Sequence, residues 1–372
     1  MEVLYFCNAK IKAFKKFNRN SRCTIFDTRM RSINLFKKIF VMAILLCTFL
    51  SLLFWSDLGI LNFTSLAVKT IPVKNKLCYV SMNDERIQMN NKTDLKMIYY
   101  ITPTYPRPEQ IPELTRLSHT LMHVPRIHWV IADDQPTCSE VVKNVLRKSG
   151  IPFTHIASPK PFHYRSNNFP RGVANRRAAL DWIRHNVREG ILYFGDDDNT
   201  IDLELFEEMR LTKKVSMFPV GLIGGYGVSS PIIKDGKVAG FFDSWPGSRT
   251  FPVDMAGFAV NIEYLTSTAS MPYIAGHEED KFLVSLGLKI EDIEPLADNC
   301  TKILVWHTRT VKFKKPTLKI KLDKITGETY KNFADLIKET SKLGMATIDS
   351  TSGTKPLITY DRKTYESLTD IL

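Results

Sequence analysis

The stretch Ile191-Leu192-Tyr193-Phe194-Gly195-Asp196-Asp197-Asp198-Asn199 joins four apolar residues to three consecutive carboxylates. The apolar run predicts a buried strand, and Gly195 marks the point at which that strand ends. Three adjacent carboxylates repel one another unless a cation lies among them. Because ligands of open α/β sheets bind beyond the carboxyl ends of the strands, we expect this acidic turn to lie in a ligand site.

Strands and helices alternate on the amino-terminal side of this stretch. Short apolar runs predict strands, and apolar residues at helical spacing predict a helix after each strand. Such alternation places the strands parallel to one another in a doubly wound, Rossmann-like sheet, so the predicted fold class is α/β. The predicted strands are 97–101, 127–132, 153–157 and 191–194, and the predicted helices begin near Ile111, Ser139 and Gly172.

Polar residues follow the other predicted strands as well. Pro103-Thr104-Tyr105 ends the first strand, Asp133-Asp134 ends the second, and Arg171, Arg176 and Arg177 open the helix before the acidic strand. Basic side chains near a helix N-terminus favour an anion, and carboxylate oxygens suit Mg²⁺ or Mn²⁺, which can bridge to a diphosphate. A solvated acidic turn and ordinary surface arginines are the alternative explanation.

The charge of the 372-residue chain is concentrated at its start. Its formal net charge is +12, but residues 1–38 hold ten basic and two acidic residues, a net of +8. The remaining 334 residues therefore carry only +4, which gives no reason to propose a nucleic-acid partner.

An uncharged run, Ile39–Trp55, follows the basic block. As a helix its 17 residues would measure roughly 25 Å, enough to cross the core of a bilayer. Positive residues before the run predict a cytoplasmic N-terminus, and hence a single-pass type II membrane protein with a lumenal remainder. A buried core helix and a cleaved signal peptide are the alternatives.

Beyond this signal anchor the sequence predicts three parts. Residues 56–94 are predicted to form a stem, 95–312 the α/β domain, and 313–372 an extension of unknown role with a helical stretch near 330–343. Cys78, Cys138 and Cys300 form an odd lumenal set, in which Cys78 either pairs between chains or stays a free thiol. Asn62, Asn91 and Asn299 begin N-glycosylation sequons, of which we expect the last two to be modified.

Several blocks resemble the animal β1,3-glucuronosyltransferases, glycosyltransferase family 43, in the same order over residues 97–312. They include Pro170-Arg171-Gly172-Val173, Tyr193–Thr200, Pro252–Val260 and Val305–Thr310. The resemblance implies a Golgi membrane homodimer that uses Mn²⁺ and has a GT-A type fold, a Rossmann-like fold with a doubly wound mixed sheet. It also implies inverting transfer of glucuronic acid from UDP-glucuronate to a terminal galactose of a proteoglycan linkage region or glycoprotein glycan, forming a β1,3 linkage. A related transferase of another UDP-sugar and a non-catalytic glycan-binding Golgi protein are the alternatives.

The resemblance assigns roles on the donor side. Asp198 would bind the metal ion, while Arg171, Arg176, His307 and Arg309 would face the diphosphate or the sugar carboxylate, anions that arginine can bind through two hydrogen bonds. The residues implied for the nucleoside are Pro103, Thr104, Tyr105, Asp134, Asp196 and Asp197.

On the acceptor side the resemblance points to Trp245, Arg249 and Asp254. The ring of Trp245 would either stack on a sugar or lie in the core. Ser229 stands where vertebrate members carry an acceptor-binding Glu, which leaves the acceptor open. The family's base maps to Glu279, but Glu278 and Asp280 flank it, so a one-residue ambiguity remains.

Overall fold

We analysed the protein as a computed structural model, which describes residues 75–86, 94–166, 168–245, 247–325, 331–356, 358–360 and 363–365. The chain divides into compact units 1–71 and 72–372, and all of these residues belong to the second. The predicted cytoplasmic tail, the predicted membrane span 39–55 and the sequons at Asn62 and Asn91 lie outside them. In the ranges just given, no helix is long and apolar enough to cross a membrane.

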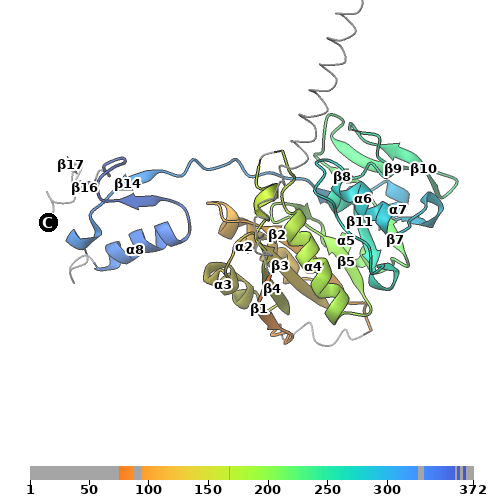
Figure 1. The fold of residues 1–372 in the computed structure, drawn as a ribbon, viewed down its shortest axis with the longest axis horizontal. Helices are drawn as coiled ribbons and strands as arrows, with labels where there is room; N and C mark the ends of the chain where they lie inside the picture. The colour runs from red at the N-terminus through yellow and green to blue at the C-terminus, as the bar shows by residue number, and fades with distance from the viewer. Residues whose placement is uncertain are drawn as a thin grey trace, which may run out of the picture. The chain divides into compact units, whose positions relative to one another are not determined.

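The main sheet has eight strands in the order β1-β4-β3-β2-β5-β11-β7-β12 (Figure 1). Its middle strands, β4, β3, β2 and β5, are parallel, which confirms the predicted parallel core. The connecting helices also lie where the sequence predicts them. The bounds are β2 Ile98–Thr104, α2 Gln110–Leu121, β3 Ile127–Asp133, α3 Glu140–Ser149, β4 Phe153–Ala157, α4 Val173–Asn186 and β5 Ile191–Phe194.

The second half of the sheet makes it mixed. β11 (Phe258–Asn261) runs antiparallel to both β5 and β7 (Val215–Met217), and β12 (Ile293–Pro295) runs parallel to β7. The alternation of strands and helices predicted only the parallel part, whereas the mixed sheet that the family resemblance implies is confirmed. The protein therefore has a mixed α/β fold.

Alternate residues of the central strands face two separate apolar cores. Ile101 and Leu192 point to the core that receives α4 and α6 (Glu278–Ser285), whereas Tyr100 and Tyr193 point to the core of α2 and α3. The second core also receives α5 (Leu203–Met209). Both faces of the sheet are thus covered, as the near-continuous apolar strands require.

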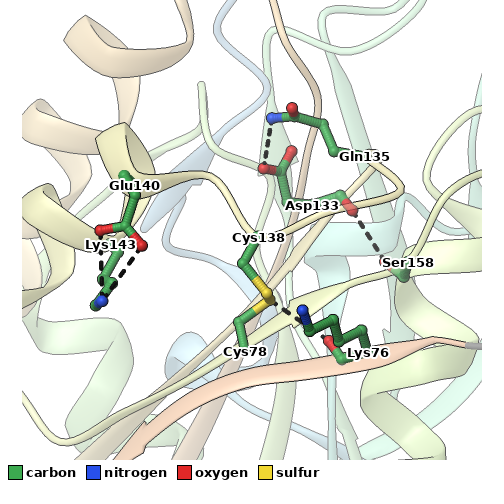
Figure 2. The surroundings of a disulfide bond; sticks show 8 residues. All are labelled: Lys76, Cys78, Asp133, Gln135, Cys138, Glu140, Lys143 and Ser158. Carbon is green, nitrogen blue, oxygen red and sulfur yellow. Dashed lines mark hydrogen bonds and ion pairs between the residues drawn. A yellow bond between two sulfur atoms is a disulfide. The ribbon is translucent and has the colours of Figure 1, made fainter.

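One strand of this sheet comes from the predicted stem. β1 (Lys76–Ser81) pairs antiparallel with β4, so ordered structure begins well before Met97, where the sequence analysis placed it. β1 carries Cys78 to Cys138, just before α3, and the two form a disulfide (Figure 2). Both alternatives for Cys78, a pair between chains and a free thiol, are therefore wrong. Cys300 is the free cysteine among the described residues.

A five-stranded sheet, β10-β9-β8-β13-β6, carries the segments that follow the acidic turn. β13 pairs with β8 and β6, which brings the segment after residue 306 toward the turn after β5. Its strands are β6 Thr200–Ile201, β8 Val220–Gly221, β9 Val228–Lys234, β10 Lys237–Phe242 and β13 Val305–Trp306, and the short α7 is Ala297–Cys300.

The C-terminal extension has a small apolar cluster of its own. α8 (Lys331–Lys342) confirms the predicted helix, and Ala334 and Ile337 on it pack with Ile320 and Ile325. The strands of this segment are β14 Thr317–Lys319, β15 Thr347–Asp349, β16 Ile358–Tyr360 and β17 Lys363–Tyr365.

Candidate active site

A cleft of about 860 Å³ opens beyond the carboxyl ends of β2, β3 and β5, the place that the sheet topology predicts for a ligand. Nine residues named from the sequence line it together, and so do Arg107, Lys160 and Arg165, which sequence reasoning missed. The nine are Pro103, Thr104, Tyr105, Asp134, Arg171, Arg176, Asp196, Asp197 and Asp198.

The acidic turn starts at Gly195 because a side chain does not fit there. A Cβ at Gly195 would lie 1.8 Å from the hydroxyl oxygen of Tyr100, a buried residue of β2. Tyr100 therefore packs directly against the backbone at the end of β5. The three residues that follow, Asp196, Asp197 and Asp198, line the cleft.

Two of the three carboxylates have a cationic partner. Asp197 accepts hydrogen bonds from Arg107 Nη2 at 2.7 Å and Arg107 Nη1 at 2.8 Å, and a third from Thr104 Oγ1 at 2.7 Å. Asp196 pairs with Arg176. Both oxygens of Asp197 are thus engaged by protein, whereas the sequence analysis expected this residue to contact a nucleoside.

Asp198 differs from its neighbours, because within the described part of the chain no donor or cation contacts its carboxylate. Burial, together with the charges of Asp197 and Asp196, raises the pKa of Asp198 to about 6. A divalent cation would remove this penalty. The described residues hold no group of three His, Cys, Asp or Glu side chains able to bind a metal. Asp198 therefore fits a cation that takes its other ligands from a diphosphate and water, as Mg²⁺-type ions often do.

Aromatic and basic groups form the other end of the cleft. The guanidinium of Arg107 lies 4.6 Å from the centre of the Tyr105 ring, and that of Arg171 lies 5.6 Å from it. Asp134 accepts a hydrogen bond from the backbone N–H of Lys160 at 2.6 Å. Positive charge and the rings of Tyr105 and Phe169 thus line a space that suits an anionic nucleotide.

Gly172 allows Arg176 to reach this cleft. Gly172 has φ +75°, the left-handed region, and a Cβ there would lie 2.5 Å from Arg176 Nη1. Glycine at this position lets the chain turn into α4 while the arginine packs back over it. The first turn of α4 then presents Arg176 to Asp196.

His307 and Arg309 do not line the cleft itself. His307 Nδ1 lies 3.2 Å from Asp254 Oδ2, and this hydrogen bond raises the pKa of His307. Thr308 donates its hydroxyl to the backbone carbonyl of Asp198, which fixes the segment beside the acidic turn. Arg309 is exposed to solvent. His307 thus links the predicted donor side to Asp254 on the predicted acceptor side.

Trp245 is a surface residue, so the alternative that placed it in the core is wrong. Its side chain is 48% exposed, and one part of its ring covers Gly276, where a Cβ would lie 2.1 Å from it. Arg249 lies 4.7 Å from the Trp245 ring and 3.1 Å from the Asp243 carboxylate. The ring therefore stands beside the start of α6, where the predicted base is found.

The structure separates the carboxylates at the start of α6. Asp280 is fully buried and accepts hydrogen bonds from the backbone N–H groups of Thr250 (2.7 Å) and Phe251 (2.9 Å). It therefore holds two segments of the chain together and is unavailable as a base. Burial raises the pKa of Glu279 to about 7, helped by the charges of Glu278 and Asp254. A pKa near neutrality suits a general base, so Glu279 stays the predicted base, and the buried Asp280 is the less suitable of the two.

Ser229 and Asn299 complete the residues named from the sequence. Ser229 is buried in β9, and its hydroxyl has no hydrogen-bond partner in the ranges that the structure covers. Asn299 is exposed, as a modified sequon must be, and its backbone has φ +54°. Asparagine is one of the residues that tolerate this conformation. Glycosylation of Asn299 stays a prediction.

The family profile and the similar proteins found by comparison all point to the same family. The profile of glycosyltransferase family 43 matches residues 117–311. A Drosophila melanogaster protein named galactosylgalactosylxylosylprotein 3-beta-glucuronosyltransferase S is 52% identical over 291 residues, which are 76% of this chain and 71% of that protein. A Mus musculus protein named galactosylgalactosylxylosylprotein 3-beta-glucuronosyltransferase 2 is 44% identical over 240 residues, which are 62% of this chain and 74% of that protein.

A Caenorhabditis elegans protein of the same type, sqv-8, is 44% identical over 247 residues, 62% of this chain and 68% of that protein. Among solved structures, S. aureus TarS overlaps with a TM-score of 0.38 at 18% identity, over 57% of this chain and 37% of that chain. An overlap this weak carries no argument. The sequence relatives and the family profile carry the assignment.

Proposed function

The chain belongs to glycosyltransferase family 43, and from this premise we propose that it transfers glucuronic acid from UDP-glucuronate to a terminal galactose. The acceptor is the galactosyl-galactosyl-xylose linkage region of a proteoglycan, which the names of the relatives specify. The observation that carries the proposal is the position of Asp198, an unpaired carboxylate in a basic cleft at the end of the sheet.

The cleft supports a nucleoside diphosphate sugar as the donor. Lys160, Arg165 and Arg171 line it without an acidic side chain paired to them in the described ranges, so it holds spare positive charge for an anion. Tyr105 offers a ring for a base, and arginine can bind either the diphosphate or the glucuronate carboxylate through two hydrogen bonds. The arrangement of sheet and cleft fits a GT-A type fold, which we propose for residues 95–312.

We infer that the enzyme uses Mn²⁺, with Asp198 as the protein ligand. When bound there, the ion would neutralise the charge that develops on the leaving diphosphate. Asp197 would not compete for it, because Arg107 holds both of its oxygens, and Arg176 partly neutralises Asp196 by pairing with one of its oxygens. His307 would contribute further positive charge beside the phosphates.

Glu279 would act as the general base on the acceptor side. Inversion requires one displacement: the galactose hydroxyl oxygen bonds to the anomeric carbon as the bond to UDP breaks. The hydroxyl proton passes to Glu279, whose raised pKa makes its carboxylate a stronger base. Trp245, Arg249 and Asp254 would orient the galactose, since they lie around the start of α6 or bond to His307.

We propose that the protein is a type II Golgi membrane protein, anchored by residues 39–55, and that it forms a homodimer. The basic leader before an uncharged run supports the orientation. The Cys78–Cys138 disulfide supports an oxidising compartment such as the secretory pathway. Chemical cross-linking and protease protection of the membrane form would test these two points.

A transfer assay tests the function. The full-length protein in detergent is given a panel of UDP-sugars with Mn²⁺, and acceptors that end in either the linkage-region trisaccharide or N-acetyllactosamine. We expect transfer from UDP-glucuronate to the trisaccharide, and transfer slower by ~10²-fold or more with Glu279→Gln. Transfer from another UDP-sugar would identify a related transferase. UDP binding without transfer to any acceptor would indicate a glycan-binding protein, an alternative to which Ser229 had pointed.

A further inference from the structure

Arg107 lies in the loop between β2 and α2 and bonds to a residue ninety positions away. Its Nη2 and Nη1 donate to the two carboxylate oxygens of Asp197 at 2.7 and 2.8 Å. The side chains are 12% and 7% exposed, so the pair is largely shielded from water. A two-bond contact between guanidinium and carboxylate is both strong and directional.

Neighbouring side chains also hold Arg107 and Asp197 in place. Its guanidinium lies over the ring of Tyr105 at 4.6 Å, so one cation joins the aromatic end of the cleft to the acidic turn. Behind it, Thr104 donates to Asp197, and Gln110 donates to Thr104 Oγ1 at 3.2 Å and to Asp133 at 3.3 Å. These bonds leave the Asp197 carboxylate a single orientation.

As a result, the three adjacent aspartates, Asp196, Asp197 and Asp198, have different roles. Arg107 holds Asp197 and Arg176 holds Asp196, while no protein cation contacts Asp198 within the described residues. Without Arg107, a shielded carboxylate would stand unpaired next to Asp198. It would repel the donor diphosphate and compete for the cation, because an unpaired buried charge is costly.

We propose that Arg107 is a positioning residue of the donor site, which fixes the Asp197 carboxylate through two hydrogen bonds and keeps it from competing for the cation, so that Asp198 is the carboxylate that binds the cation. The inference rests on the proposed function, because it takes a nucleoside diphosphate and a divalent ion as the ligands. Arg107 itself need not touch either of them.

A double-mutant cycle tests this coupling. Isothermal titration calorimetry measures the binding of UDP to the full-length protein in detergent, with Mn²⁺ present, for Arg107→Met, Asp197→Asn and the double variant. We expect Arg107→Met to weaken UDP binding by about tenfold or more. Asp197→Asn should weaken it less than Arg107→Met does, and the double variant should bind no more weakly than Asp197→Asn alone, since no unpaired carboxylate remains.

Two further measurements separate positioning from a general structural role. Arg107→Lys should fall between wild type and Arg107→Met, because an ammonium cannot form the two-bond contact. Electron paramagnetic resonance should show that Arg107→Met changes the affinity for Mn²⁺ in the presence of UDP, and that the double variant restores it. Neither readout requires turnover.

Arg86→Met is the matched control. Arg86 forms an equally close pair with Asp84, at 2.6 Å, and also donates to backbone carbonyls at the end of α2, outside the cleft. Its loss should lower the thermal unfolding temperature and leave UDP affinity unchanged.

The inference is overturned if Arg107→Met binds UDP and Mn²⁺ like wild type, or if the two substitutions add without coupling. Should Arg107→Met not fold, the double variant decides, and weaker UDP binding by it than by Asp197→Asn would count against the inference. A wild-type protein that binds UDP and transfers glucuronate while the cycle shows no coupling would leave the proposed function intact. If the wild-type protein neither binds UDP nor transfers glucuronate, both the proposed function and the role of Arg107 are wrong.

Discussion

His307 Nδ1 lies 3.2 Å from Asp254 Oδ2, while the other oxygen of Asp254 accepts the backbone N–H of Ala256 at 3.0 Å. The Asp254 carboxylate thus stabilises its own loop and also holds the imidazole of His307. Its charge further contributes to the raised pKa of Glu279. Asp254 thus raises the pKa of both His307, beside the acidic turn, and Glu279, the proposed base.

Asp254→Asn should change the pH dependence of donor binding. The hydrogen bond to Asp254 raises the pKa of His307, so the imidazolium persists to a higher pH than in an ordinary histidine. The affinity for UDP-glucuronate should fall as pH rises through this pKa, because a positive charge is lost. In Asp254→Asn the fall should move to lower pH, and in His307→Gln it should disappear. Calorimetric titrations between pH 5.5 and 8.5 measure it, and an unmoved midpoint would contradict the coupling.

Glu279→Gln should retain donor binding while kcat falls by ~10²-fold or more, the usual value of general-base catalysis. Burial raises the pKa of Glu279 to about 7, so wild-type kcat should rise with pH through that value as the carboxylate forms. Glu278→Gln is the control and should remain active. Near-normal turnover by Glu279→Gln, with Glu278→Gln inactive, would assign the base to the other residue.

Asp198→Ala should lower kcat by at least ~10²-fold, the scale of a lost electrostatic stabiliser. EDTA should abolish transfer by the wild type, and added Mn²⁺ should restore it, because the ion neutralises the leaving diphosphate. Full activity of the wild type in EDTA would remove the metal from the mechanism. Both effects are measured as transfer rates with and without EDTA at a saturating concentration of UDP-glucuronate.

Replacing Cys78 and Cys138 together by serine should destabilise the folded domain. The disulfide closes a loop between residues 60 apart, for which the loop-entropy relation gives about 4 kcal/mol as an upper guide. We expect a loss of about 2–4 kcal/mol in chemical denaturation. Wild-type protein should migrate as a monomer on non-reducing gels, whereas a band of twice the mass that Cys78→Ser abolishes would show pairing between chains. Cys300→Ser should leave migration unchanged.

The sequence by itself determined the parallel core and most of the cleft. A buried strand or an amphipathic helix is encoded in the spacing of neighbouring apolar residues, so β2, β3, β4 and β5 could be read from local pattern. Once those strands are parallel, their carboxyl ends must share one edge of the sheet. Thr104, Asp134 and Asp198 were for this reason predicted together, although they lie far apart in the chain.

The tertiary structure decided what depends on contacts between distant segments. β1, with the sequence Lys76-Leu77-Cys78-Tyr79-Val80-Ser81, is a half-exposed edge strand without a clear apolar period, and only its pairing with β4 brings Cys78 to Cys138. Arg107 looked like any arginine after a proline-rich turn, because its partner is ninety residues away.

The difference in environment between Glu279 and Asp280 also depends on tertiary contacts. Successive helical residues point about 100° apart, so one carboxylate faces Thr250 and Phe251 inside the protein while its neighbour does not share those contacts. Local spacing specifies which elements form and where they end. Which of two adjacent side chains meets which partner is set by packing between elements, because only there do burial and charge differ from one residue to the next.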